Sequence, residues 1–121
     1  MAENRKLKYL FVCFAGVNRS PTAVHVAKKM AFKKGIELEA DFFGIITFNG
    51  QSKTSVREKC ESYDRVFVME DYIKKKLVEE YYVDPKKIHC FGIEDNYRIK
   101  RESDRILLEA TLEQELDKWV R

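Results

Sequence analysis

The stretch from Cys13 to Ala23 constrains the fold of this chain more than any other feature of the sequence. Residues 7–12 are mostly apolar, which is typical of a buried parallel strand, and this strand is expected to end at Cys13. Ser20 is a good N-cap, Pro21 suits a first helical turn, and small apolar residues then recur at helical spacing. The sequence therefore predicts a strand, a tight loop and a helix.

The predicted loop is suited to hold an oxyanion. It precedes a helix, so its backbone N–H groups and the helix dipole would both favour negative charge there; the residues are Phe14, Ala15, Gly16, Val17 and Asn18. Positive surroundings of this kind favour the thiolate form of a cysteine. We therefore interpret Cys13 as a nucleophile, Arg19 as a planar clamp for two phosphate oxygens, and Ser20 as a donor to the sulfur. The alternative is that Cys13 is only a buried small hydrophobe at a strand end.

The remaining sequence predicts strands alternating with helices within one domain, residues 1–121. The first helix is expected to end near Gly35, after two lysines that suit a helix C-terminus. We expect Cys60 and Cys90 to be buried. The other expected elements are a strand centred on 41–46, a helix capped by Ser52, a strand at 66–69, a helix from Glu70 and Asp71 with Ile73, Leu77 and Tyr81 on one face, a strand at 88–91, and a final helix with Leu108, Leu112, Leu116 and Trp119.

Composition limits the class of protein. A net charge of +3 with 36% charged residues indicates a charged, soluble surface and gives little reason to expect nucleic-acid binding. No stretch reaches transmembrane length and the charged start does not resemble a signal peptide, so we expect no membrane association. Three cysteines without metal-ligand spacing indicate a reducing compartment, and the cytoplasm is the expected location.

Cys13-x5-Arg19-Ser20-Pro21 after a first strand resembles the low-molecular-weight protein tyrosine phosphatase family. Residues 63–70 are similar to that family's third strand and its acidic end, and residues 93–97 to the late loop that carries its acid. The resemblance covers most of the chain. It implies a three-layer α/β/α fold with a four-stranded parallel sheet of order 2-1-3-4, phosphotyrosine protein phosphatase I-like.

Ligands of open parallel sheets bind beyond the carboxyl ends of the strands, so acidic residues that directly follow a strand are the candidates for the site. Glu70 and Asp71 follow the third strand, and Glu94 and Asp95 follow the fourth. Asp41 and Asp84 lie within or before strands and are poor candidates. The family resemblance assigns the general acid to Asp95.

The expected reaction is attack by Cys13 on phosphorus, with Asp95 protonating the leaving oxygen and then assisting hydrolysis of the cysteinyl-phosphate. It needs no metal or organic cofactor. Its substrate would be a phosphorylated protein, with phosphotyrosine favoured, or a small aryl phosphate, and Tyr97 would line the entrance or be a half-buried loop aromatic.

The sequence departs from the family pattern in several places. The loop lacks the family's second cysteine, and Asn96 stands where the family has proline after the acid. Two rival functions also remain. An arsenate reductase of the same fold would need redox cysteines near strand three, and residues 69–76 contain none. A non-catalytic phosphate- or phosphotyrosine-binding module would be expected to lack the nucleophile or the acid. The sequence leaves the oligomeric state open.

Overall fold

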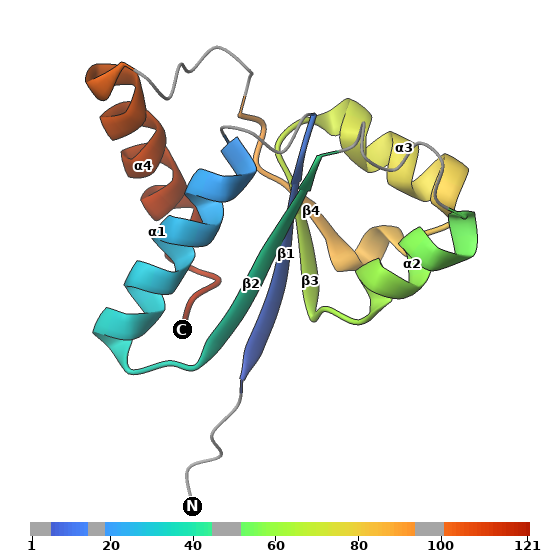
Figure 1. Ribbon diagram of the computed structural model, residues 1–121, viewed down its shortest axis with the longest axis horizontal. Helices are drawn as coiled ribbons and strands as arrows, with labels where there is room; N and C mark the ends of the chain where they lie inside the picture. The colour runs from blue at the N-terminus through green and yellow to red at the C-terminus, as the bar shows by residue number, and fades with distance from the viewer. Residues whose placement is uncertain (1–5, 15–18, 45–51, 94–100) are drawn as a thin grey trace, which may run out of the picture.

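The computed structural model describes residues 6–14, 19–44, 52–93 and 101–121 (Figure 1). Within these residues strands and helices alternate, as the sequence predicts. The elements are β1 (Leu7–Cys13), α1 (Arg19–Lys34), β2 (Leu38–Gly44), α2 (Lys53–Glu61), β3 (Arg65–Val68), α3 (Asp71–Tyr81), a 3-10 turn (Pro85–Lys87), β4 (Ile88–Cys90) and α4 (Glu102–Leu116).

The four strands form one parallel sheet in the order β2-β1-β3-β4, which confirms the expected α/β fold and strand order. In the register of β1 with β2, Leu7 lies opposite Leu38 and Cys13 opposite Gly44. On the other side of β1, Val12 lies opposite Val68, which in turn lies opposite Cys90 of β4. The carboxyl ends of all four strands therefore meet at one edge of the sheet.

Alternation along the central strands divides the core between the two faces of the sheet. Tyr9, Phe11 and Cys13 pack on the side of α1 and α4, whereas Leu10 and Val12 pack on the side of α2 and α3. Figure 1 shows the same two helical layers, with the sheet between them. This is the three-layer arrangement that covers both faces of a parallel sheet.

Local signals explain where two helices begin or end. Gly35 has a φ of +68°, and the bonds from Gly35 N to Phe32 O and from Ile36 N to Ala31 O form a Schellman motif at the end of α1. At α2, the Ser52 hydroxyl accepts a hydrogen bond of 3.0 Å from Ser55 N. Both predictions are confirmed.

Two expectations were wrong. Helix α1 begins at Arg19, so Ser20 lies inside its first turn and is not the N-cap. A Ser20 cap would make Pro21 the first helical residue, so the helix starts two residues earlier than the side-chain preference for a cap suggested. Cys90 is only partly buried, because β4 is an edge strand and has a neighbouring strand on one side only.

Helix α4 covers the sheet face that also contacts α1. Leu108, Leu112 and Leu116 are almost fully buried, and the Tyr9 hydroxyl donates a hydrogen bond to the Trp119 carbonyl just after the helix. Lys34 Nζ reaches the Val120 carbonyl at 2.7 Å. Within the described residues, none of the helices combines the length and apolar character needed to cross a bilayer.

We expect Leu112→Ala to lower the free energy of unfolding by about 2–5 kcal/mol, because it removes a fully buried side chain between α4 and the sheet. Leu107→Ala is the matched control on the same helix, since Leu107 is 58% exposed, and it should change stability by no more than about 0.5 kcal/mol. Urea unfolding followed by circular dichroism measures both. Equal, small losses in the two variants would show that α4 does not contribute to the core.

Candidate active site

Cys13 and Arg19 lie at the carboxyl edge of the sheet, where the strands end. Cys13 is the last residue of β1 and is 2% exposed, and α1 begins at Arg19. The predicted strand, connection and helix are therefore confirmed at both ends. Ala15, Gly16, Val17 and Asn18, whose backbone is expected to form the anion cradle, lie outside the described residues. Phe14 follows Cys13 and is 45% exposed, so it presents apolar surface to solvent.

Arg19 is buried at this edge and contacts two other strand ends. Its side chain is 2% exposed. The Nη1 nitrogen donates to Glu70 Oε1 at 2.5 Å and to the Ile93 carbonyl at 2.7 Å. Glu70 comes directly before α3, and Ile93 comes three residues after β4 ends. Arg19 therefore joins the start of α1 to the segments that follow β3 and β4.

The contact with Glu70 gives the buried guanidinium of Arg19 a negatively charged partner. A guanidinium is always protonated in proteins, and burying it without an acceptor is costly. Glu70 is 26% exposed, so the pair lies between the core and solvent. Pairs of this kind are short and strongly directional because both groups are charged.

Ser20 is the predicted donor to the Cys13 sulfur. Its side chain is completely buried, and its hydroxyl has no hydrogen-bond partner among the described residues. The role of Ser20 as a donor to the Cys13 sulfur therefore stays a prediction.

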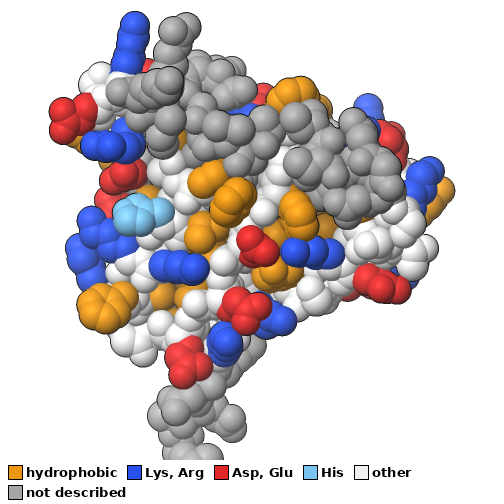
Figure 2. Space-filling model, in the orientation of Figure 1, with side chains coloured by type: hydrophobic (Ala, Val, Ile, Leu, Met, Phe, Trp, Pro, Cys, Tyr) orange, Lys and Arg blue, Asp and Glu red, His pale blue; other side chains and the backbone are white. Residues whose placement is uncertain are grey.

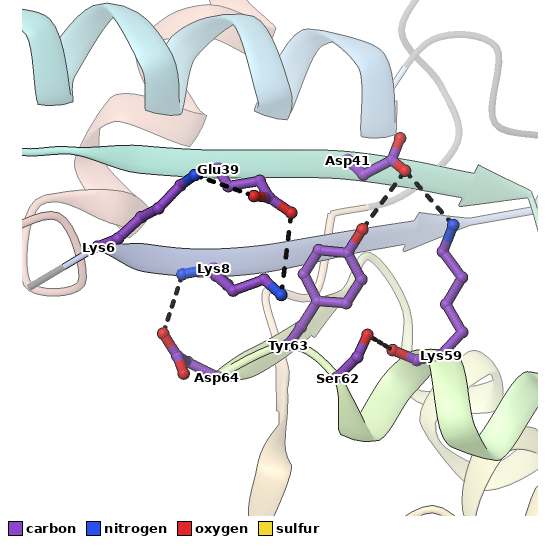
Figure 3. Close-up of polar contacts among 8 residues, drawn as sticks. All are labelled: Lys6, Lys8, Glu39, Asp41, Lys59, Ser62, Tyr63 and Asp64. Carbon is purple, nitrogen blue, oxygen red and sulfur yellow. Dashed lines mark hydrogen bonds and ion pairs between the residues drawn. The ribbon is translucent and has the colours of Figure 1, made fainter.

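Asp41 lies within β2 and Asp84 lies before β4, as predicted, and both make structural contacts. Asp41 Oδ2 accepts from the Tyr63 hydroxyl at 3.4 Å and pairs with Lys59 Nζ at 3.5 Å, which links β2 to α2 (Figure 3). Burial, and then the Asp41 carboxylate, raise the pKa of Tyr63. Asp84 accepts from Lys86 N at 2.9 Å and caps the 3-10 turn.

The predicted acid, Asp95, and its neighbours Asn96 and Tyr97 lie outside the described residues. What the structure describes is the point where their segment begins. Ile93 is buried, its N–H donates to the Met69 carbonyl at 2.7 Å, and its own carbonyl accepts from Arg19. The chain that leads to Asp95 therefore departs from the same edge as Cys13 and Arg19.

Sequence reasoning placed Glu70 at this edge but missed its contact with Arg19. One local signal could have indicated that the Glu70 side chain has a distant partner. Glu70 occupies the N-cap position of α3, where serine, threonine, aspartate and asparagine are preferred, and its side chain makes no capping bond. Asp71, by contrast, is exposed in the first turn of α3, where a negative charge complements the helix dipole.

Charges elsewhere on the surface are mixed. Figure 2 shows lysine and arginine side chains interspersed with aspartate and glutamate over the face in view. Among the described residues, no group of three histidine, cysteine, aspartate or glutamate side chains is arranged to hold a metal ion.

No protein-family model and no curated protein sequence matches the chain, whereas several solved structures share its fold. The arginine phosphatase YwlE of Bacillus subtilis superposes with a TM-score of 0.69 at 17% identity, over 93% of this chain and 95% of that one. A low-molecular-weight protein tyrosine phosphatase from T. tengcongensis gives 0.67 at 20% identity, over 93% and 99%. The tyrosine phosphatase Wzb of Escherichia coli K30 gives 0.62 at 14% identity, over 93% and 95%.

The chain has the low-molecular-weight protein tyrosine phosphatase fold. Each superposition includes 95% or more of the matched phosphatase, so this protein spans nearly the whole length of each. The resemblance drawn from residues 13–21, 63–70 and 93–97 is thus confirmed at the level of the fold.

Within this phosphatase fold, the other two cysteines are poorly placed to form a disulfide with Cys13. Cys13 packs on the α1 and α4 side of the sheet, and Cys60 and Cys90 pack on the opposite side. Cys13 and Cys90 are also separated by β3, which implies roughly 9–10 Å between their strands, beyond the reach of a disulfide. This arrangement speaks against the arsenate reductase alternative.

Cys60 is also chemically protected. Its side chain is 1% exposed, and burial raises the pKa of the Cys60 thiol to about 11. Burial raises the pKa of Cys90 as well. Because the thiolate is the reactive form, neither residue has the surroundings of a redox-active cysteine.

We expect Cys60 to resist alkylation by iodoacetamide at pH 8 in the folded protein. A thiol with a pKa of about 11 holds about one hundredth of the thiolate of an unperturbed cysteine at that pH, and burial blocks access as well. Mass spectrometry of digested protein measures the labelling of each cysteine, and the same protein in urea is the control in which Cys60 should react. Rapid labelling of Cys60 without urea would contradict the buried, protonated thiol.

Proposed function

We propose that this protein is a cysteine-dependent phosphatase that hydrolyses phosphate monoesters through a cysteinyl-phosphate intermediate. The observation that carries the proposal is the position of Cys13 and the buried Arg19 at the two ends of one short connection, at the carboxyl edge of a sheet with the fold of known phosphatases. Open parallel sheets bind ligands at this edge. Phosphate esters are accordingly the expected substrate class.

Cys13 is the proposed nucleophile. Its sulfur would form a bond to phosphorus while the bond from phosphorus to the ester oxygen breaks. A neighbour of the same fold supports covalent chemistry, because YwlE has been solved as a cysteine-to-serine mutant whose active-site serine is phosphorylated. Water would then attack the cysteinyl-phosphate, releasing inorganic phosphate and regenerating the thiolate.

Arg19, the loop amides and Asp95 would complete the machinery. The guanidinium and the N–H groups of Phe14, Ala15, Gly16, Val17 and Asn18 would stabilise the charge on the equatorial oxygens, with Ser20 supporting the sulfur. Asp95 would protonate the departing ester oxygen and later accept a proton from the attacking water. The scheme uses no metal or organic cofactor.

A phosphorylated protein is the proposed substrate, with phosphotyrosine the favoured side chain. Phe14, the half-exposed residue after Cys13, is proposed to give an apolar wall at the entrance, with Tyr97 as the second aromatic. Neighbours of this fold carry the names of both tyrosine and arginine phosphatases, so peptides with phosphotyrosine and phosphoarginine should be compared directly. All three cysteines are described residues and none of them forms a disulfide, which is consistent with a reducing, cytoplasmic location.

We expect Cys13→Ser to lower turnover of 4-nitrophenyl phosphate by about 10³-fold or more, with chelator present, while inorganic phosphate still binds. An alcohol at this position is a far weaker nucleophile, whereas the anion-binding groups remain. Cys90→Ser is the matched control and should keep activity per folded molecule. Substantial turnover by the Cys13 variant would contradict the nucleophile, and phosphate binding without turnover in the unaltered protein would favour the non-catalytic binding module.

Asp95→Ala should slow phenyl phosphate far more than 4-nitrophenyl phosphate. A general acid is worth about 10²–10⁴-fold when the leaving oxygen needs a proton, and little when the oxygen departs readily as an anion. The high-pH limb of the rate profile should also flatten, since loss of the Asp95 proton no longer limits the rate. Rates over a series of aryl phosphates measure this dependence.

Asp71→Ala is the control for this experiment, because Asp71 is an exposed carboxylate that follows β3. It should leave the dependence on the leaving group unchanged. If the Asp71 variant instead shows the selective loss with phenyl phosphate, the acid comes from the segment after β3 and the assignment of Asp95 is wrong.

A further inference from the structure

Glu70 places a carboxylate directly against the arginine that is proposed to bind phosphate. A negative group here would be expected to weaken anion binding unless it does something else for the site. Its side chain makes no capping bond to α3, although it occupies the N-cap position, and it reaches Arg19 instead. The contact therefore needs an explanation in terms of Arg19.

The geometry of the contact fixes the guanidinium. Nη1 carries two N–H groups, and it donates to two acceptors, Glu70 Oε1 at 2.5 Å and the Ile93 carbonyl at 2.7 Å. Because the guanidinium is planar and rigid, holding one nitrogen in two directions fixes the plane of the whole group. The edge formed by Nε and Nη2 then has a defined orientation, and this is an edge that can bind two oxygens of one phosphate.

We propose that Glu70 is a positioning residue for Arg19: its carboxylate oxygen, together with the Ile93 carbonyl, orients the guanidinium for the equatorial oxygens of the transferring phosphoryl group. This inference deepens the proposed phosphatase function and rests on it. Glu70 itself does not touch the substrate in this role. Its acceptor oxygen holds the guanidinium in the binding orientation before the substrate binds.

A carboxylate at this position could have three other roles, and each predicts a different effect of substitution. A general acid would be needed in proportion to the basicity of the leaving group, as for Asp95. A residue that only stabilises the fold would change the fraction of folded protein and leave kcat unchanged. A residue that acts through its charge would give tighter phosphate binding once the charge is removed. A positioning acceptor should be replaceable by glutamine, which keeps the oxygen and loses the charge.

The experiment compares Glu70→Ala and Glu70→Gln with the unaltered protein. We expect Glu70→Ala to lower kcat for 4-nitrophenyl phosphate by about 10–100-fold, with a smaller change in KM, because misorientation matters most in the transition state. Glu70→Gln should stay within about threefold of the unaltered kcat. Asp71→Ala is the matched control, since it removes the adjacent, exposed carboxylate and should leave kcat unchanged. Thermal melts set the assay temperature below unfolding for every variant.

A double-mutant cycle with Arg19→Lys tests whether Glu70 acts through Arg19. Lysine cannot present a planar fork, so the loss caused by Glu70→Ala should shrink below about threefold in the Arg19→Lys background. Independent, multiplying losses would overturn the proposal. So would equal losses in the alanine and glutamine variants, or an alanine variant with unchanged kcat.

Binding of inorganic phosphate separates this inference from the proposed function. If the unaltered protein binds phosphate but turns over no ester, the phosphatase proposal fails, and calorimetry still decides the role of Glu70. Positioning predicts that the phosphate dissociation constant rises about tenfold in Glu70→Ala and does not rise in Glu70→Gln. Tighter binding in both variants would show that only the charge of Glu70 matters and would overturn the positioning role.

Discussion

The buried guanidinium of Arg19 is the constraint on which the arrangement of the site depends. A permanent charge at 2% exposure needs acceptors, and breaking a buried pair by removing one partner typically costs about 3–5 kcal/mol. The acceptors come from the segments after β3 and β4, which can reach Arg19 only because β3 lies beside β1 and β4 beside β3. The hydrogen bonds of the buried Arg19 therefore depend on the order of the strands in the sheet.

The sheet beneath the site is stiffened by aromatic packing on the same face as Cys13. Phe67 stacks on Phe11 with ring centroids 5.2 Å apart and on Phe91 at 5.0 Å, so one row of rings crosses β1, β3 and the end of β4. Helix α4 closes over this face through its buried leucines, and the Tyr9 hydroxyl holds the chain beyond it. Packing of this kind across the strands supports the positions of Cys13 and Arg19 at the carboxyl edge, where the proposed nucleophile and clamp lie.

Sequence reasoning succeeded where the deciding interaction is local. The end of α1 at Gly35 and the Ser52 cap each depend on residues within five positions, and the leucines of α4 follow a simple period. It failed where the deciding partner is distant or where burial depends on sheet position. The bond between Arg19 and Glu70 spans 51 positions, and Cys90 is only partly buried because β4 lies at the edge of the sheet.

The fold, the nucleophile and the clamp do not by themselves select the phosphorylated side chain, since neighbours of this fold are named for tyrosine and for arginine. Both leaving groups need a proton, so the acid does not separate them either. Selection must come from the walls of the entrance. A phosphoarginine side chain carries nitrogen donors that need acceptors nearby, and the acceptor oxygen of Glu70 is already bonded to Arg19. An aryl ester needs apolar surface, which the half-exposed ring of Phe14, the residue after Cys13, is proposed to offer. We therefore propose an aromatic ester, rather than a guanidine phosphate, as the preferred substrate of the proposed phosphatase.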